Sequence, residues 1–470
     1  MKEFGQQLPH LRTEVPGAQS QQWVDRLAQV ECPAITHRRQ KRRVQGVESP
    51  IVFAQAKGAN IEDADGNIFV DLSGAFAVAG VGHAHPKVVE AAQKQAATLI
   101  HAMGDLFPSR EKVLLSERLA DIAPEGLSRS ILAIGGSDAV EACLKTALIA
   151  TGKRRVLSFG GAYHGMSLGA LSVSSYRDSF REPFDGLVGA SDLRLPYPGQ
   201  PGSPFESDGQ ACLDYVDFLL GSDTSGTASI AALIVEPIQG RGGVILPPQG
   251  FLKGLREITK KHGVFLIFDE IYTGLGRTGA YFACEHENVV PDLMAIGKSL
   301  AGGAPIGACL ATEEAMEGWG RPSGEAIHTS TFLGNPLVAS MALAVLDVLR
   351  DEDLVARSQA EGAYALDWLT RELSSFSCVR EVRGKGMMLG VELQRSDGTS
   401  WGGGGVQAMS DILKDGVLVA PGGPEGDVIS LAPPFNIDRA QLDCGLEAIA
   451  RWCARMSGVS YRSNHEQQRS

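Results

Sequence analysis

Two short apolar runs, each followed at once by charged residues, constrain the fold of this chain most strongly. Residues 264–268 and 293–296 contain no polar side chain. An unbroken apolar run without alternation is typical of a strand that is covered on both faces in a parallel sheet. Asp269 follows the first run, and Lys298 stands one residue beyond the second. Ligands of open α/β sheets bind beyond the carboxyl ends of the strands, so we expect Asp269 and Lys298 to lie at a binding site.

A carboxylate and a lysine at two strand ends match the needs of pyridoxal phosphate. A lysine amine forms a Schiff base with the aldehyde of that cofactor, and a buried carboxylate keeps the pyridine nitrogen protonated, so that the ring accepts electrons. An alternative is that Asp269 only begins a helix and that Lys298 only belongs to a solvated turn. These two residues alone leave both interpretations open.

Other strand candidates end in residues that suit the same cofactor. Residues 130–134, 155–159 and 229–235 are predicted strands, and an amphipathic helix at 251–262 leads back to the run at 264–268, which indicates a parallel α/β sheet. A glycine-rich turn before a helix presents free N–H groups to phosphate, and an aromatic residue at a strand end can stack on a flat ring. The residues after these three strands are Gly136 and Ser137, then Tyr163 and His164, then Glu236. We also expect Asp138 and Glu141 to form a capping box at the start of the helix after Gly136.

Composition narrows the classes of partner. The chain has 470 residues, of which 44% are hydrophobic and 21% charged, and a net charge of -12, which disfavours nucleic acid and anionic membranes as general partners. The basic cluster at 37–43 is the one stretch that suggests a nucleic-acid patch. Eight scattered cysteines without metal-type spacing indicate reduced thiols and no metal site. No signal-peptide pattern and no apolar run of membrane-spanning length is present, so we expect a cytoplasmic protein.

The stretch FDEIYTGLGRTGAYFACEHENVVPDLMAIGKSLAGGAPIGA, residues 268–308, resembles the signature of the class III (subgroup II) aminotransferases. The resemblance extends from about residue 50 to about residue 455. It implies an α/β chain of fold type I among the pyridoxal phosphate enzymes, with a large domain on a mostly parallel central sheet and a smaller α+β domain. The expected domains are 1–75 as an N-terminal arm with part of the small domain, 76–336 as the large domain that binds the cofactor, 337–456 as the C-terminal small domain, and 457–470 as a tail.

The resemblance also implies roles for individual residues. Lys298 and Asp269 are the expected catalytic residues. Tyr272 stands where many relatives carry glutamine near the 3-hydroxyl of the cofactor, and a tyrosine can still donate a hydrogen bond there. Thr331 falls on a threonine that binds phosphate in the other subunit's site, which implies a homodimer. The expected residues that bind pyridoxal 5'-phosphate are Gly136, Ser137, Tyr163, His164, Glu236, Asp269, Tyr272, Lys298 and Thr331.

The positions that face the substrate differ from the family pattern. Phe76 falls where the family places a substrate-facing side chain. Many members that act on 2-oxoglutarate carry arginine where this chain has Met166, glutamate where it has Arg241, and an arginine that binds the α-carboxylate where it has Ser430. Because paired arginine and carboxylate groups are a major source of recognition, the substrate does not carry over from the family. Arg241 either faces solvent or a nearby carboxylate, or takes over a carboxylate of the substrate.

The function implied is transamination by ping-pong exchange. An amino group moves from an amino acid or amine to a keto acid or aldehyde, and Lys298 forms the Schiff base and then transfers protons as base and acid. The alternative is an amino-acid racemase or epimerase on the same fold, since the loss of the usual arginine suits a reaction without a keto acceptor. A dinucleotide-binding oxidoreductase is disfavoured because no GxGxxG follows the first strand. A binding protein without catalysis is disfavoured because Lys298 and Asp269 are both retained.

Overall fold

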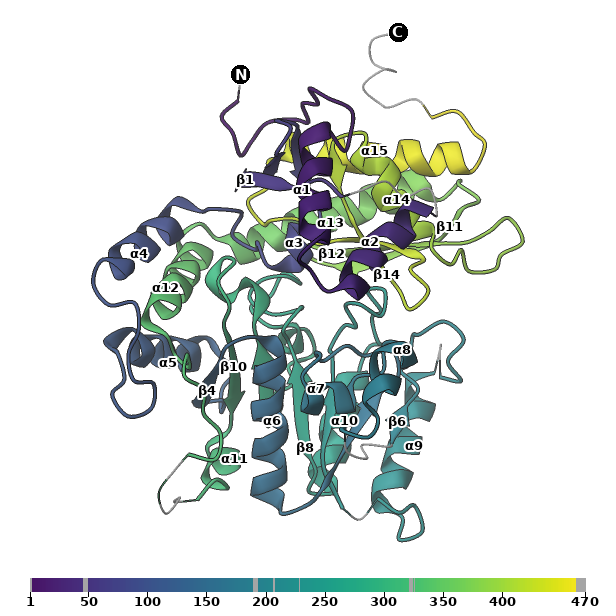
Figure 1. The fold of residues 1–470 in the computed structure, drawn as a ribbon. Helices are drawn as coiled ribbons and strands as arrows, with labels where there is room; N and C mark the ends of the chain where they lie inside the picture. Colours follow the sequence, from purple (N-terminus) through teal and green to yellow (C-terminus); the bar gives the residue numbers. More distant parts are fainter. Residues whose placement is uncertain are drawn as a thin grey trace. The chain divides into compact units, whose positions relative to one another are not determined.

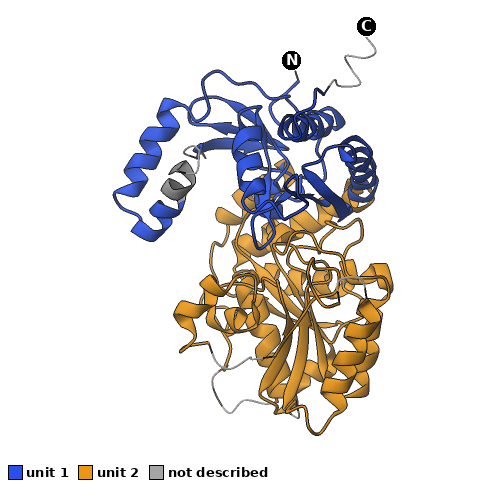
Figure 2. Ribbon diagram, turned by 90° about the vertical axis from the view of Figure 1, so that its right-hand side faces the viewer, with its two compact units in different colours: residues 1–85, 357–470 blue, residues 86–356 orange. Residues whose placement is uncertain are grey.

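The computed structural model divides the chain into two compact units (Figure 2). Unit 1 comprises Met1–His85 and Arg357–Ser470, and unit 2 comprises Pro86–Ala356. The structure describes residues 2–44, 50–188, 193–205, 208–227, 229–320, 324 and 326–461, without the side chains of 39–44.

Unit 2 is built on a seven-stranded sheet with the strand order β4-β10-β9-β8-β7-β5-β6. Its strands are β4 (Arg129–Ala133), β5 (Arg155–Phe159), β6 (Arg194–Leu195), β7 (Ile230–Val235), β8 (Phe265–Asp269), β9 (Leu293–Ile296) and β10 (Gly307–Ala311). Strand β10 is antiparallel to both of its neighbours, and the other pairs are parallel. Every residue of β7, β9 and β10 is buried, as expected for strands covered on both faces. The expectation of a mostly parallel central sheet is confirmed.

Helices cover this sheet and join its strands. Helix α6 lies along the strands (Figure 1), and its buried alanines and valine pack against β7, β8, β9 and β10 in one apolar core. Helix α10 packs on β8 through its apolar side. The helices of unit 2 are α4 (Pro86–Ala96), α5 (Arg110–Ile122), α6 (Gly136–Thr151), α7 (Leu168–Val173), α8 (Asp178–Arg181), η1 (Glu182–Phe184), α9 (Gly209–Gly221), α10 (Phe251–Lys261), η2 (Ala283–Glu287), η3 (Lys298–Ala301), α11 (Glu313–Glu317) and α12 (Pro336–Asp351).

Unit 1 contains two four-stranded sheets. In the first, β1 (Phe53–Lys57), β2 (Asn60–Asp63) and β3 (Ile68–Asp71) form antiparallel hairpins, and β13 (Val417–Leu418) pairs in parallel with β3. Gly58 and Gly66 take positive φ angles of 56° and 81° in the two hairpin turns, a conformation that glycine adopts readily. The second sheet is antiparallel, with the order β11 (Val379–Lys385), β12 (Met388–Leu393), β15 (Val428–Leu431) and β14 (Ala420–Gly422).

The helices of unit 1 are α1 (Ala18–Ala28), α2 (Pro33–Val44), α3 (Gly74–Ala77), α14 (Gly404–Leu413) and α15 (Arg439–Met456), and α13 (Leu354–Leu373) crosses the boundary between the units. The basic cluster 37–43 lies in α2, and its side chains from 39 onward are outside the described residues. The predicted tail 457–470 is described only to residue 461. No helix in the described ranges is both long and apolar enough to cross a membrane.

The unit boundaries differ from those expected after residues 75 and 336. Helix α12 packs on α4, α5 and η3, so it belongs to unit 2 rather than to the C-terminal region. The turn around Phe76 packs with β3 and belongs to unit 1. Both unit boundaries are therefore set by contacts between segments that lie far apart in the sequence.

Candidate active site

Lys298 follows β9 after one glycine, at the carboxyl end of the central sheet. Its Nζ lies 4.0 Å from the centroid of the Tyr272 ring. The amine has no hydrogen bond or ion pair within the part of the chain that the structure describes. Burial lowers the pKa of Lys298 to about 8; the cation of Arg241 lowers it too, and the carboxylates of Asp269 and Glu236 act in the opposite direction. A lysine in this state supplies a neutral amine near physiological pH.

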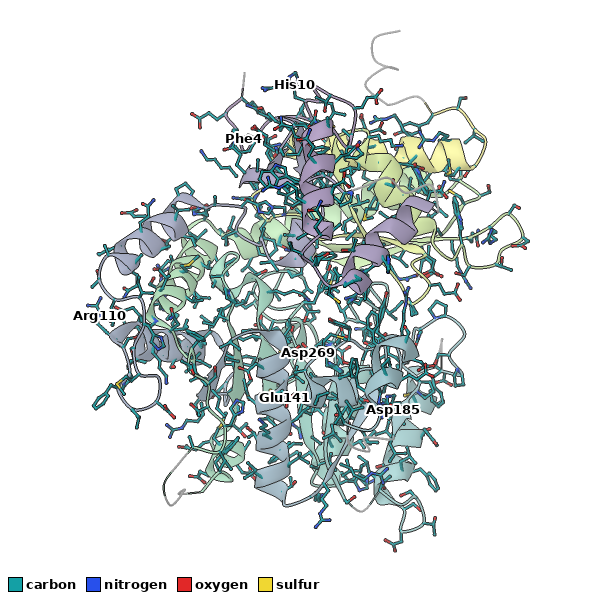
Figure 3. The ribbon with its side chains drawn as sticks, viewed as in Figure 1. Phe4, His10, Arg110, Glu141, Asp185 and Asp269 are labelled. Carbon is teal, nitrogen blue, oxygen red and sulfur yellow. The ribbon has the colours of Figure 1, made fainter. Side chains whose placement is uncertain are left out.

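Asp269 ends β8 and is labelled in Figure 3. Its side chain is buried, and the residue is 4% exposed. Its Oδ2 lies 2.7 Å from Nδ1 of His164, and its Oδ1 accepts the backbone N–H of Ile271 at 3.0 Å. The buried Nε2 of His164 has no hydrogen-bond partner among the described residues. The histidine and the amide therefore fix the orientation of a carboxylate whose burial demands such partners.

Glu236 directly follows β7, and its carboxylate ties two turns together. It accepts the backbone N–H of Tyr163 at 2.8 Å and that of Gly240 at 2.9 Å. Burial raises the pKa of Glu236, and the charge of Asp269 adds to this shift. A Cβ at Gly240 would lie 2.9 Å from the Tyr272 ring, so only glycine allows this close approach. Glu236 thus holds the Tyr163 turn in place at the end of its strand.

The N-terminus of α6 forms a place for an anion. Gly135 is the N-cap, no side chain caps the helix, and a Cβ at Gly135 would meet nothing within 4 Å. The first N–H groups of a helix have no partner inside it and attract negative charge. Ser137 Oγ accepts the backbone N–H of Met166 at 3.1 Å, which joins the turn after β5 to this helix end.

The expected capping box at α6 is wrong. Asp138 accepts the backbone N–H of Ile134 at 3.0 Å, and Glu141 accepts that of Gly169 at 2.7 Å. Both carboxylates bind neighbouring loops instead of the helix end. The N–H groups at the start of α6 consequently stay available to a ligand.

Arg241 lies among three aromatic rings, Tyr163, Tyr176 and Phe180, which we call the aromatic bowl. Its guanidinium carbon is 4.5 Å, 4.9 Å and 5.8 Å from the three ring centroids. The guanidinium forms no hydrogen bond or ion pair with any residue that the structure describes. Aromatic faces attract a cation, so the rings position the guanidinium and leave its N–H donors open to an anion. Its charge also contributes to the lowered pKa of Lys298.

Known proteins of one family match this chain over most of its length. The model of the family "Aminotransferase class-III" matches residues 42–452. The chain belongs to the class III aminotransferases. An acetylornithine aminotransferase of Methanopyrus kandleri is 36% identical over 401 residues, which cover 85% of this chain and 94% of that protein. An alanine/serine racemase of Pyrococcus horikoshii is 32% identical over 410 residues, which cover 86% of this chain and 85% of that protein.

A solved structure agrees with this assignment. The amine transaminase of an uncultivated Pseudomonas species, in its form with bound pyridoxal phosphate, superposes with a TM-score of 0.80 at 31% identity, and the match covers 87% of this chain and 95% of that one. This class III aminotransferase therefore has the fold of the fold type I enzymes and uses pyridoxal phosphate, as the sequence predicted.

The residues present fit that cofactor. The aminotransferase offers an amine on Lys298 without a hydrogen-bond partner in the described part, an uncapped helix end at Gly135 for a phosphate, and a buried carboxylate on Asp269. The three groups stand at the ends of β9, β4 and β8, which are members of one sheet. This arrangement agrees with the chemistry that the cofactor requires.

The contacts described above do not include three of the predicted site residues. Thr331 is exposed and lies in the loop before α12. Phe76 and Ser430 belong to unit 1. Ser430 is buried on β15, and its Oγ has no hydrogen-bond partner in the described ranges. Met166, by contrast, is exposed beside Ser137 in unit 2.

Other residues of the site carry no clear signal in the sequence. Tyr176 and Phe180 complete the aromatic bowl from a segment beyond α7, and nothing in their local pattern separates them from ordinary aromatic residues. Glu270, the neighbour of Asp269, has a structural role: its buried carboxylate accepts the backbone N–H groups of Ala283 at 3.0 Å and Cys284 at 2.8 Å. Of the two adjacent acidic residues, Asp269 thus belongs to the candidate site and Glu270 stabilises the fold.

Proposed function

We propose that Lys298 is the residue that binds the cofactor covalently in this aminotransferase. The observation that carries the proposal is the amine of this half-buried residue, which lies on the Tyr272 ring without a hydrogen-bond partner in the described part. Burial lowers the pKa of this amine to about 8, so that a usable share is neutral and nucleophilic. When bound, pyridoxal phosphate supplies a reactive aldehyde and a ring that accepts electrons.

The other residues at the strand ends orient the cofactor. Asp269, held by His164, would hold the proton of the pyridine nitrogen. The uncapped N–H groups at Gly136 and Ser137 would bind the phosphate. Tyr163, Glu236 and Tyr272 would be further residues that hold the cofactor. The neutral Nζ of Lys298 would act as the base that accepts a proton from the substrate carbon and as the acid that returns it.

The experiment that separates transaminase from racemase uses one amino donor and no acceptor. An aminotransferase converts the bound cofactor to its amine form, seen in the visible absorbance, and releases one keto product for each site. A racemase, the activity named for the Pyrococcus horikoshii relative, forms the mirror-image amino acid without a keto product. Racemisation without release of keto acid would reject the transaminase function.

We further propose that Arg241 binds a carboxylate of the substrate. The aromatic bowl positions a guanidinium whose donors are open within the described part, and the same cation acts on Lys298. A charge-assisted contact with a carboxylate would satisfy these donors. The family resemblance puts Met166 and Ser430 where many members carry arginine, and in this proposal Arg241 takes over the recognition that those two positions do not supply.

Thr331, in this proposal, acts in the active site of a second copy of the chain. Apolar side chains are exposed in the same loop and in the loop before α5: Leu99, Ile100, Met103, Leu106, Phe107, Ile327 and Phe332. Phe332 contacts the His101 ring at a centroid distance of 5.5 Å, so the two loops form one surface. An apolar surface of this kind fits burial in a homodimer.

Mixed dimers test the role of Thr331. Lys298→Ala and Thr331→Ala chains, each poorly active alone, are expressed together and isolated as the mixed dimer. If Thr331 acts across the interface, one site contains both intact residues and about half of the normal activity returns. Mixed dimers that stay inactive would place Thr331 in its own subunit's site, and a Thr331→Ala chain that is fully active alone would place it outside any site. We also propose that the enzyme works in the cytoplasm, since all eight of its cysteines are free.

A further inference from the structure

The backbone of Lys298 is held in a conformation that lysine avoids. Its φ angle is 41°, in the left-handed region. A residue with a Cβ is strained there, so the conformation persists only where the surrounding structure imposes it, and such strain is concentrated at functional sites. The chain is closely packed at this point, because a Cβ at Gly297 would lie 3.6 Å from Cα of Gly136 and 3.6 Å from Cγ2 of Ile271. The backbone thus sets the direction in which the lysine side chain leaves it.

The amine at the other end of that side chain lies on the ring of Tyr272. Nζ of Lys298 is 4.0 Å from the ring centroid, within the range of about 6 Å in which a cation is attracted to an aromatic face. The ring packs against the backbone of Gly240, where a Cβ would lie 2.9 Å from Cδ2 and 3.0 Å from Cγ of the ring. Both partners of the contact are therefore positioned by the structure around them.

Charged groups from several elements act on the same amine. Burial lowers the pKa of Lys298, the carboxylates of Asp269 and Glu236 raise it, and the cations of Arg241 and Arg277 lower it. Both carboxylates have other partners, and neither is bonded to the amine in the part of the chain that the structure describes. The protonated amine therefore takes its direct stabilisation from an aromatic face rather than from a carboxylate.

The hydroxyl of Tyr272 does not replace the missing carboxylate. Burial raises the pKa of Tyr272, with the cation of Arg277 acting against this shift and the carboxylate of Glu236 adding to it. The phenol consequently stays neutral at physiological pH and offers the amine no negative charge. Any stabilisation of the protonated amine by this residue comes from the face of its ring.

We propose that the Tyr272 ring stabilises the protonated amine of Lys298 and so keeps this lysine able to return a proton. The inference rests on the proposed function, in which Lys298 acts first as a base and then as an acid. Burial alone favours the neutral amine, which accepts a proton but has none to give. The ring offsets part of that effect without placing a second base beside the amine.

Removal of the aromatic face tests the inference without any substrate. Apoenzyme is mixed with pyridoxal phosphate at a series of pH values, and the midpoint of the capture rate reports the pKa of the Lys298 amine. Tyr272→Leu should lower this midpoint by roughly one unit relative to the unmodified chain, the scale of a desolvated contact between a cation and a ring. Tyr272→Phe keeps the ring and loses the hydroxyl, so its midpoint should not move. An unchanged or raised midpoint in Tyr272→Leu, or an equal shift in Tyr272→Phe, would overturn the role of the ring.

Ile271 offers a matched control. Its side chain lies beside Gly136 and Gly297, so Ile271→Ala also opens apolar space close to Lys298 but removes no aromatic face. The midpoint should therefore not fall in this variant. If Ile271→Ala lowers it as much as Tyr272→Leu does, the shift comes from lost packing and the inference is rejected. Should circular dichroism show that Tyr272→Leu does not fold, Tyr272→Met takes its place, because methionine adapts to irregular space and has no aromatic face.

Nuclear magnetic resonance supplies a readout that needs no cofactor. The amines of the apoenzyme are methylated with ¹³C-labelled formaldehyde, and the Lys298 signal is identified by its absence in Lys298→Ala. Methyl protons above a ring are shifted upfield, so this signal should lie upfield in the unmodified chain and in Tyr272→Phe and return to the ordinary lysine position in Tyr272→Leu. An ordinary position in the unmodified chain would contradict the contact itself.

The inference and the proposed function fail in different ways. If Lys298→Ala captures pyridoxal phosphate as fast as the unmodified apoenzyme does, Lys298 is not the residue that binds the cofactor, and the proposed function is contradicted. If capture requires Lys298 but its midpoint does not respond to the loss of the Tyr272 ring, only the role of the ring is contradicted.

Discussion

The guanidinium of Arg241 lies over the ring of Tyr163, with 4.5 Å between its central carbon and the ring centroid. Tyr163 is itself fixed by its backbone bond to Glu236 at the end of β7. The guanidinium is therefore positioned through Tyr163 by Glu236, at the end of β7. It contacts no carboxylate in the described part of the chain. Recognition of the substrate depends on this relationship in our account.

Arg241→Ala should lower kcat/KM for substrates that bear a carboxylate and leave kcat/KM for simple amines unchanged. The loss of a charge-assisted contact is worth roughly 1.5–3 kcal/mol, which corresponds to about a 10- to 150-fold loss in kcat/KM. Arg177 is the control, because it also stacks on the bowl residue Tyr176, at 5.2 Å. Arg177→Ala should leave the ratio between the two kinds of substrate unchanged. An equal effect of Arg241→Ala on both kinds, or none on either, would remove the carboxylate role.

Asp269→Asn keeps the size of the side chain and loses its charge. Turnover should fall by orders of magnitude while circular dichroism shows an intact fold, since the ring nitrogen would no longer be held protonated. His164→Phe, which removes the 2.7 Å bond to Asp269, should have a smaller effect in the same direction. If the turnover of Asp269→Asn is close to that of the unmodified enzyme, Asp269 does not hold the ring nitrogen protonated and has only a structural role at the start of a turn.

The apoenzyme should capture pyridoxal phosphate with a pH dependence set by Lys298. Burial lowers the pKa of the amine from 10.5 to about 8, so the neutral, reactive form grows as pH rises through about 8. At pH 7 roughly a tenth of the amine is neutral, against far less than a hundredth for an ordinary lysine. Rates of absorbance change after mixing, measured from pH 6 to 10, give the midpoint. A rate that is still rising steeply at pH 10, without a midpoint near 8, would show an unperturbed lysine.

Glu270 should make stability depend on pH. Burial raises the pKa of its carboxyl to about 7 in the folded chain, so the folded state favours the protonated form. Its stabilising contribution is complete below the unfolded value and is lost as pH rises through about 7. Glu270→Gln should therefore gain melting temperature relative to the unmodified chain between pH 5 and pH 8. A difference that stays constant over this range would contradict the raised pKa.

The sequence predicts best the residues that directly follow buried strands. Apolar runs are local signals, and they correctly place Asp269, Glu236 and Lys298 at the end of one sheet. The aromatic bowl was not predicted, since Tyr176 and Phe180 meet Arg241 only through the tertiary fold. The capping box at α6 was wrong because its two carboxylates found partners in neighbouring loops.

The turn from Gly74 to Ala77, in which all four residues have positive φ angles, shows a second limit of sequence reasoning. Ala75 and Phe76 have residue types that avoid positive φ, so their local preference argues against the conformation that they adopt. Asp71 stabilises this conformation by accepting the backbone N–H of Ala75, four residues further on. His83, twelve residues away in the sequence, contacts the same carboxylate. The sequence therefore predicts where Phe76 falls in the family pattern and cannot predict how it is presented.

Trapping the covalent link between enzyme and cofactor tests the central claim most directly. The enzyme with bound pyridoxal phosphate is reduced with borohydride, digested and mapped by mass spectrometry. The account predicts a single reduced adduct on the peptide that contains Lys298, and none in Lys298→Ala. An adduct on any other lysine, or an unchanged adduct in that variant, would contradict it.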